Sequence, residues 1–319
     1  MNITGRARLI IPVDLISSAL EKAIQSVRPS YFLSKCATLR ENQLVITSHH
    51  KKAAVNLNKF TGVKIISFGK AAVEMSDFFS DLLGKQLSSG IVVAPSVPKH
   101  KKPRLAYFAS DHPIPTKKSV RAASAVLEFA EKTRENELVL CLISGGGSAL
   151  LSLPAYGLAL EEKQRVHRAL IECGAPIEEI NCVRKHLSQV KGGWLAHALA
   201  PSAVISLVLS DVLSNDLSTI ASGPTVPDET NFHDAKRVMQ MHGLWKKFAG
   251  ARQVIQEGLD GFRAENPKPH AACFLRAHSL ILASNGTAVN AAAAFFERRQ
   301  IEVKKIYCVL PDDFLDTAH

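Results

Sequence analysis

A short apolar segment runs straight into three glycines, and few folds accommodate such a junction. Residues 138–143 consist of leucine, valine, cysteine and isoleucine, which predicts a buried strand. Ser144 follows the strand, and Gly145, Gly146 and Gly147 come next. Consecutive glycines cost conformational entropy, so they indicate a sharp turn, a close approach to a ligand or backbone N–H groups aimed at an anion. A tight turn that binds nothing is the alternative, and this segment alone leaves it open.

Strand-like and helix-like segments alternate along the chain. Short apolar runs end in turn residues, and the segments between them repeat apolar residues at helical spacing. This alternation predicts an α/β fold with a Rossmann-like parallel sheet and helices on both faces. Strands are expected at 44–47, 63–68, 91–94, 105–109, 138–143, 203–209, 279–283 and 303–310, and helices at 14–27, 70–84, 116–132, 160–172 and 285–299, with a further helical stripe over 177–190.

Polar and glycine-rich segments follow several of the expected strands. These segments are Lys70 and residues 111–115, 144–148 and 211–225. Ligands of parallel sheets bind beyond the carboxyl ends of the strands, where all four segments would lie. The sequence therefore predicts one shared site at this edge of the sheet.

Charge and composition narrow the range of partners. The chain has 319 residues and a net charge of +10, which favours anionic ligands. Its tightest basic cluster, residues 99–102, has no interleaved aromatic residues and the chain is only 6% aromatic, so nucleic acid binding is not expected. The apolar runs are too short to span a membrane, so no membrane association is expected. The six cysteines are scattered without a C-x-x-C pair, which predicts a reducing compartment and no structural zinc; we expect the cytoplasm, with mitochondria as the alternative.

Several familiar kinds of site are excluded by their missing motifs. The glycine run has neither the lysine of a Walker A loop nor a glycine at position 150, where a dinucleotide-binding fingerprint needs one and Leu150 stands. Ser148 is not part of a G-x-S-x-G elbow, and no histidines show a metalloprotease spacing. The kind of site that these exclusions leave open is one that binds or transfers phosphate groups.

Lysine and aspartate residues near the strand ends could carry such chemistry. Lys70 could contact a transferring phosphoryl group, although it could equally be an ordinary surface lysine. Asp211 and Asp216 could hold Mg²⁺ through their carboxylates, whereas each alone could also cap a loop. Three cations lie off the apolar stripe at 177–190 and could clamp a carboxylate or phosphates, or could face solvent: Arg184, Lys185 and Lys191.

Taken together, the motifs resemble those of the glycerate kinases of the bacterial type-2 and animal family. The matching segments are 68–72, 111–115, 143–151, 181–193, 209–212 and 220–225, with a weaker match at 283–288. The resemblance implies ATP- and Mg²⁺-dependent phosphorylation of D-glycerate, with 2-phosphoglycerate the favoured product, in a cleft between two α/β domains. Some family members carry the name hydroxypyruvate reductase, but the missing dinucleotide fingerprint argues against hydride chemistry.

Site roles follow from the resemblance residue by residue. The resemblance implies that Lys70 is a catalytic lysine. Asp211 is the candidate base or metal ligand on the physical grounds given above, and Asp216 is the candidate second metal ligand. The candidate ATP-binding residues are Ser144, Gly145, Gly146, Gly147 and Ser148, and the candidate substrate-binding residues are His112, Arg184, Lys185, Lys191 and Ser222. Two alternatives stay open: a non-catalytic short form that binds a nucleotide or another anion, and a kinase for another small hydroxy acid.

The resemblance also predicts how the chain divides into domains. Residues 1–245 are expected to form a large N-terminal α/β domain, and residues 246–319 the beginning of a second, truncated α/β domain. Family members continue for roughly another hundred residues, a domain-scale segment with glycine-rich motifs and a catalytic arginine. Because such an arginine can contribute several orders of magnitude in rate, we expect this chain alone to be a poor kinase.

Overall fold

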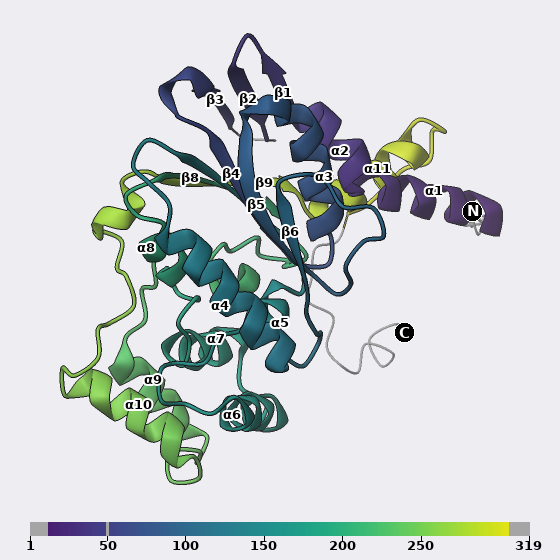
Figure 1. Cartoon of the computed structure of the whole chain (residues 1–319). Helices are drawn as coiled ribbons and strands as arrows, with labels where there is room; N and C mark the ends of the chain where they lie inside the picture. Colours follow the sequence, from purple (N-terminus) through teal and green to yellow (C-terminus); the bar gives the residue numbers. More distant parts are fainter. Residues whose placement is uncertain (1–11, 49–50, 306–319) are drawn as a thin grey trace, which may run out of the picture.

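Six parallel strands form the central sheet of the computed structural model, which describes residues 12–48 and 51–305 (Figure 1). The strands lie in the order β6-β5-β4-β7-β8-β9, which is the order of a doubly wound sheet. The expected α/β fold is confirmed. The strands are β4 (Val63–Phe68), β5 (Leu87–Ala94), β6 (Leu105–Ala109), β7 (Leu138–Ile143), β8 (Ala203–Leu209) and β9 (Ala277–Ala283).

Alternate side chains of the strands supply two separate cores. In β7, Leu140 and Leu142 join the core that contains Met75 and Phe79 of α3 (Ala72–Leu83). Cys141 and Ile143, which follow them in the strand, point to the other face of the sheet. There α4 (Lys117–Glu131) and α8 (Trp194–Leu199) pack. Since all six residues of β7 are buried, both faces of this strand are covered, as its apolar composition predicted.

Three further helices and a small sheet accompany the face covered by α3. Helix α2 (Pro29–Cys36) packs against α3 and β9, and α1 (Val13–Ser26) lies beside α11 (Asn285–Glu297) (Figure 1). The antiparallel strands β1 (Ala37–Arg40), β2 (Gln43–Thr47) and β3 (Lys52–Asn56) form a separate sheet. The sequence pattern indicated only the middle strand, because the outer two are short and carry few apolar residues.

Four helices form a second lobe with a core of its own. They are α6 (Leu160–Glu172), α7 (Ile177–His186), α9 (Phe232–Met241) and α10 (Ala249–Leu259), at the lower left of Figure 1. The short helix α5 (Gly147–Leu150) and four 3₁₀ turns, η1 (Leu57–Lys59), η2 (Gly84–Gln86), η3 (Ile220–Ser222) and η4 (Ala272–Phe274), complete the described elements.

Two elements of the expected second domain pack with earlier parts of the chain. Helix α10 contacts α6 and α9, and β9 pairs with β8 in the central sheet. A domain that begins at residue 246 stays a prediction. Of the strand expected at 303–310, residues 303–305 have no regular secondary structure and 306–310 lie outside the described residues. No helix in the described ranges is both long and apolar enough to span a membrane.

Candidate active site

The loops after β4 and β7 meet at the point where the sheet reverses its winding direction. These two strands are neighbours, but the helices that follow them lie on opposite faces, so the loops leave in opposite directions and open a crevice. The backbone N–H of Lys70 donates to the carbonyl of Gly145 at 2.8 Å, and the N–H of Ala71 donates to Oγ of Ser144 at 3.0 Å. The two loops are therefore fixed against each other.

Glycine is required in these loops by both backbone conformation and space. Gly69 has φ +126°, and a β-carbon there would lie 2.8 Å from the carbonyl carbon of Ser144. Gly146 has φ +81°, and a β-carbon there would lie 2.9 Å from Cδ2 of His112 and 3.2 Å from Cε of Lys70. A β-carbon on Gly145 would lie 2.8 Å from Cγ of Asp211. The glycines thus make room for the side chains of other loops.

Three of the predicted site residues come together over these glycines. Lys70 follows β4, His112 follows β6 and Asp211 follows β8, and all three are exposed. Burial and the Lys70 cation lower the pKa of His112 below its usual value, while the Asp211 carboxylate acts in the opposite direction. The three side chains therefore share one electrostatic field, as the prediction of a single site requires.

A cavity of about 570 Å³ extends from this cluster towards the helical lobe. One wall is made by residues 112–115 together with Gly146 and Ser148. The opposite wall is made by α6 and α7. Five basic side chains from these helices and the loop after them line it: Lys163, His167, Arg168, Arg184 and Lys191.

The two lysines of this group are buried and donate to backbone carbonyls. Lys163 is 6% exposed and Lys191 is 1% exposed. The ammonium of Lys191 donates to the carbonyls of Leu151 at 3.1 Å and Ala221 at 3.4 Å, and that of Lys163 donates to the carbonyl of Leu153 at 3.3 Å. Neutral carbonyls do not balance a buried positive charge, so burial disfavours the charged form of both side chains.

Burial lowers the pKa of four of these basic side chains, and repulsion from neighbouring cations adds to the effect in Lys163, His167 and Lys191. Burial, aided by the Arg184 charge, lowers the pKa of Lys163 to about 7. Burial also lowers the pKa of Lys191 well below its usual value, and lowers that of Arg184 to about 10 and that of His167 to about 3. Within residues 12–48 and 51–305, no carboxylate forms an ion pair with Lys163, Arg184 or Lys191. The cavity is therefore lined by basic side chains that have no carboxylate partner in the described part of the chain.

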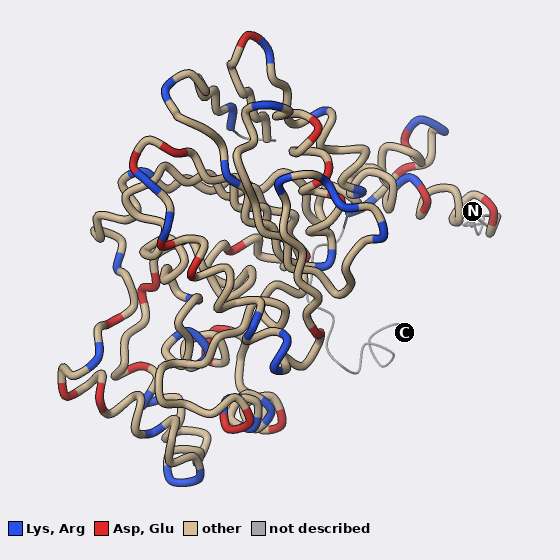
Figure 2. Tube along the Cα trace, viewed as in Figure 1, with Lys and Arg blue, Asp and Glu red and all other residues tan. Residues whose placement is uncertain are grey.

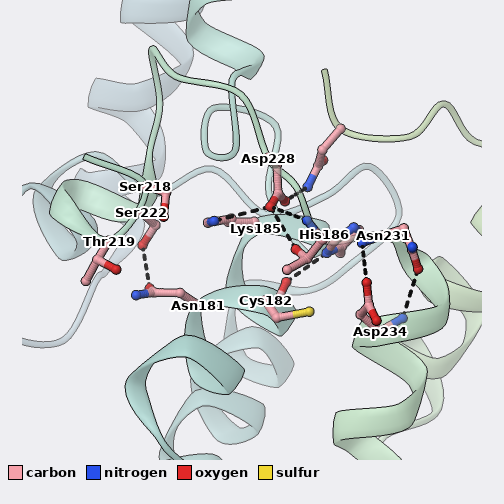
Figure 3. A network of polar contacts seen from close by, with 12 residues as sticks. Asn181, Cys182, Lys185, His186, Ser218, Thr219, Ser222, Asp228, Asn231 and Asp234 are labelled. Atoms are coloured by element: carbon pink, nitrogen blue, oxygen red, sulfur yellow. Dashed lines mark hydrogen bonds and ion pairs between the residues drawn. The ribbon is translucent and has the colours of Figure 1, made fainter. Parts of the chain in front are cut away.

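Arg184 is held in place by Ser222, Asn181 and His167. Its Nη1 donates to Oδ1 of Asn181 at 2.9 Å and to Oγ of Ser222 at 3.4 Å, and its Nη2 contacts Nε2 of His167. Figure 3 shows Asn181 hydrogen-bonded to Ser222, whose Oγ also lies 3.1 Å from Oγ of Ser148. Ala221 and Ser222 have positive φ values of 52° and 63°, a conformation that costs roughly 1–3 kcal/mol per residue and is common at functional sites.

Lys185 lies outside the cavity, although it is adjacent to Arg184 in the chain. Its ammonium forms a buried ion pair with Asp228 at 3.2 Å, and Asp228 also accepts from Nδ2 of Asn266 at 2.7 Å (Figure 3). This pair ties α7 to the segment that precedes α9. The alternative of a solvated helix face is wrong for Lys185 and Lys191, which are buried, and Arg184 is half-buried.

The two aspartates predicted to bind metal have different surroundings. Both carboxylate oxygens of Asp216 accept hydrogen bonds from its own turn, from the N–H of Ser218 at 2.9 Å, from Oγ of Ser218 at 2.6 Å and from Oγ1 of Thr219 at 2.8 Å. Asp211 faces the glycine loop beside Lys70. The described residues contain no group of three or more His, Cys, Asp or Glu side chains suited to a metal. Because Mg²⁺ is often held by one carboxylate with substrate phosphates and water, Asp211 fits the group, whereas Asp216 acts as a loop cap.

The sequence pattern indicated Arg184 and Lys191 as site residues, but it did not indicate Lys163 and His167, which also line the cavity. The helix at 160–172 was predicted with the bounds that α6 has. Lys163 and His167 are four residues apart and therefore share a face of that helix, which was the available signal. Figure 2 shows that basic positions occur in α6 and α7 as well as on outer loops, so charge alone does not single out the residues that face the cavity.

The fold and the site define an α/β protein with a cavity lined by basic side chains beside the switch point of a doubly wound sheet. The model of one protein family, described as a domain of unknown function (DUF4147), matches residues 15–256. The chain belongs to this family.

Relatives with assigned names agree with the predicted family. A glycerate 2-kinase of Pyrococcus horikoshii is 39% identical over 237 residues, which is 74% of this chain and 52% of that protein. A D-glycerate 2-kinase of Thermotoga maritima is 42% identical over 198 residues, which is 61% of this chain and 47% of that protein. The chain thus spans about half the length of these relatives.

Solved structures show the same architecture. The crystal structure of the PH0495 protein of Pyrococcus horikoshii superposes with a TM-score of 0.78 at 33% identity and covers 91% of this chain and 65% of that one. The glycerate kinase of Thermotoga maritima superposes with a TM-score of 0.73 at 30% identity and covers 90% of this chain and 62% of that one. The family predicted from the motifs is confirmed.

Proposed function

We propose that this chain belongs to a kinase that transfers the terminal phosphoryl group of ATP to D-glycerate. The observation that carries the proposal is the convergence of Lys70, His112 and Asp211 beside a cationic cavity, in a chain whose relatives are named glycerate kinases. We favour 2-phosphoglycerate as the product because two of those relatives are named 2-kinases. The scattered cysteines support a reducing compartment such as the cytoplasm.

In the proposed reaction, a hydroxyl oxygen of D-glycerate forms a bond to the terminal phosphorus, and the bond from that phosphorus to the bridging oxygen of ADP breaks. Asp211 accepts the hydroxyl proton, and Lys70 stabilises the negative charge on the transferring group. His112 lies where it can hydrogen-bond the substrate. When bound, Mg²⁺ would neutralise phosphate charge, with Asp211 as its candidate protein ligand.

Detection of the product tests this proposal. We expect the purified chain, with ATP, Mg²⁺ and D-glycerate, to form phosphoglycerate that mass spectrometry detects. Coupling to enolase, which dehydrates only the 2-phospho isomer, identifies the position of the phosphate. ATP hydrolysis without phosphoglycerate, or no product at all, would overturn the proposal for this chain.

Two other functions remain as outcomes of the same assay. The cationic cavity is compatible with a protein that binds a nucleotide or another anion without transferring phosphate, and such a protein would bind ATP but form no product. A kinase for another small hydroxy acid would phosphorylate that acid in preference to D-glycerate in a substrate panel.

Replacement of Gly145 by alanine tests the position of Asp211. The new β-carbon would displace the Asp211 carboxylate, so we expect roughly tenfold slower phosphoglycerate formation from this misplacement. Because Asp211 is exposed and can rotate, the free energy of unfolding should change by less than about 1 kcal/mol. Gly286→Ala, whose β-carbon would lie 3.5 Å from its nearest neighbour, Oγ of Ser284, is the matched control. Unchanged turnover in Gly145→Ala would contradict a role for Asp211.

A further inference from the structure

Lys185 and His186 follow Arg184 at the end of α7, and each contacts a carboxylate from another part of the chain. The ammonium of Lys185 lies 3.2 Å from Oδ1 of Asp228 (Figure 3). Nε2 of His186 lies 2.9 Å from Oε1 of Glu265. Asp228 precedes α9 and Glu265 follows α10. Of the three consecutive basic residues only Arg184 lines the cavity, and the other two connect the end of its helix to the segments that flank α9 and α10.

Both pairs are shielded from water. Lys185, His186 and Asp228 are 5%, 2% and 0% exposed, and Glu265 is half-buried. Burial opposes the charge of His186, but hydrogen bonds to the carbonyl of Cys182 and to Glu265 raise its pKa to about 9. Burial likewise opposes the charge of Asp228, but the charges of Lys185 and His186 hold its pKa below the usual value. His186 and Asp228 are therefore charged at pH 7.

Asn266 joins the two carboxylates into one network and connects this network to α8. Its backbone N–H donates to Oε1 of Glu265 at 3.0 Å, and its Nδ2 donates to Oδ2 of Asp228 at 2.7 Å. Its Oδ1 accepts from Nε1 of Trp194, the first residue of α8, at 2.7 Å. The backbone N–H and both polar side-chain atoms of Asn266 therefore hold the network together.

The turn between α7 and α8 packs against the same network at Gly192. This residue has φ +56°, a conformation that favours glycine. A β-carbon there would lie 3.0 Å from Nδ2 of Asn266, 3.1 Å from Cβ of Lys185 and 3.2 Å from Oδ2 of Asp228. The end of α7, the turn and the network therefore form one closely packed unit.

Carboxylates that lie outside the cavity fix the helix without neutralising the cavity. The hydrogen-bond partners of Arg184 in the described part of the chain carry no negative charge; they are Asn181, Ser222 and His167. A carboxylate in contact with Arg184 would compete with an anionic ligand for its guanidinium group. Replacement of buried ion pairs by apolar residues is often neutral for stability, so the geometry that the two pairs fix explains them better than stability does.

We propose that Asp228 and Glu265 are positioning residues, which orient Arg184 towards an anionic ligand of the cavity. They act through Lys185 and His186 and do not touch the ligand. This inference rests on the proposed function, since the anion that meets Arg184 is a substrate of that reaction. Loss of either carboxylate therefore weakens the binding of that anion only as far as Arg184 contributes to it.

Calorimetric titration with D-glycerate and with inorganic tripolyphosphate tests this assignment without turnover. We expect Arg184→Met to weaken the binding of at least one of these anions about tenfold, because it removes a charged hydrogen-bond donor. For that anion, Glu265→Gln and the double variant Lys185→Met/Asp228→Asn should each weaken binding about fivefold, since residues in one network are coupled by amounts of this order. The double variant removes the ion pair as a unit and leaves no unpaired buried lysine.

A cycle of single and double variants separates positioning from a structural effect. In the Arg184→Met background, Glu265→Gln should change the binding of that anion less than about twofold, because the residue through which Glu265 acts is absent. A merely structural role would weaken binding by the same factor with and without Arg184. The matched control is Glu179→Gln, in the first turn of α7, where Glu179 pairs with His242 at 2.6 Å outside the cavity. This control should leave binding unchanged.

Four results would overturn the assignment. They are the absence of binding of both anions to the unmodified chain, unchanged binding in Arg184→Met, unchanged binding in Glu265→Gln, and an effect of Glu265→Gln that persists without Arg184. An equal loss of binding in Glu179→Gln would have the same consequence. Thermal unfolding identifies variants that do not fold, and Glu265→Gln, at a half-buried position, keeps the test decisive if the double variant fails. Binding with the expected sensitivities but without phosphoglycerate formation would instead contradict the proposed function.

Discussion

Replacement of Lys70 by alanine is expected to lower the rate of phosphoglycerate formation at least about 100-fold. Removal of one preorganised group that stabilises charge in a transition state costs about that much in enzymes. The backbone N–H of Lys70, which fixes the loop to Gly145, is retained in the variant, and the side chain is exposed. The free energy of unfolding should therefore change by less than about 0.5 kcal/mol. Product formation by mass spectrometry, with thermal unfolding in parallel, provides the measurement.

Two further variants make the result for Lys70 interpretable. Lys85→Ala removes an exposed lysine that lies before β5, at the opposite end of the sheet, and should leave turnover unchanged. Lys70→Arg keeps the charge but replaces a compact ammonium by a planar guanidinium, so it should recover only part of the activity. Turnover that survives in Lys70→Ala would remove this residue from the mechanism.

Replacement of Lys163 by methionine is expected to stabilise the protein. Exchanging buried charged groups for apolar residues of similar volume often stabilises proteins by roughly 1–4 kcal/mol. Burial and the Arg184 charge lower the pKa of Lys163 from 10.5 to about 7, so the folded state binds this proton less tightly than the unfolded state. The charge therefore destabilises the folded chain fully below pH 7, and its cost falls as the pH rises from about 7 to 10.5.

Chemical denaturation at several pH values checks this expectation. The stability gained by Lys163→Met over the unmodified chain should be largest at or below pH 7 and smallest near pH 10. Arg165→Met, which removes an exposed charge from the same helix, should show a gain below about 0.5 kcal/mol at every pH. A loss of stability in Lys163→Met at pH 7 would show that Lys163 is a structural residue whose charge is balanced within the fold.

Local patterns in the sequence were sufficient to predict the main elements of the sheet. The strands β6, β7 and β8 and the helix α6 have the bounds expected from apolar runs and helical spacing. The helical stripe at 177–190 was wrong at its end, since α7 stops at His186 and the chain turns towards Gly192 and Gly193, which have positive φ. The glycine motif predicted the sharp turn that follows β7, because a turn after a buried strand is a local property of the chain.

The predicted site residues were separated into two groups by contacts between distant parts of the chain. Successive residues of a helix point about 100° apart, so Arg184 faces the cavity while Lys185 pairs with Asp228, 43 residues further along the chain. No local pattern indicates which of two adjacent cations has a carboxylate partner. In the same way, the sequence does not reveal that Asp211 faces the glycine loop, whereas the carboxylate of Asp216 accepts a hydrogen bond from the backbone of its own turn.

The amino-acid sequence determined the elements, the family and the edge of the sheet where the candidate site lies, because these depend on residue types close together in the chain. The cavity was decided by the packing of α6 and α7 against the loops after β6 and β7. The burial of Lys163 and Lys191 was also decided by the tertiary structure. Only the folded arrangement sets the exposed fraction of each side chain and its distance from the nearest carboxylate. For that reason the basic side chains that line the cavity include two that the sequence pattern did not reveal, Lys163 and His167.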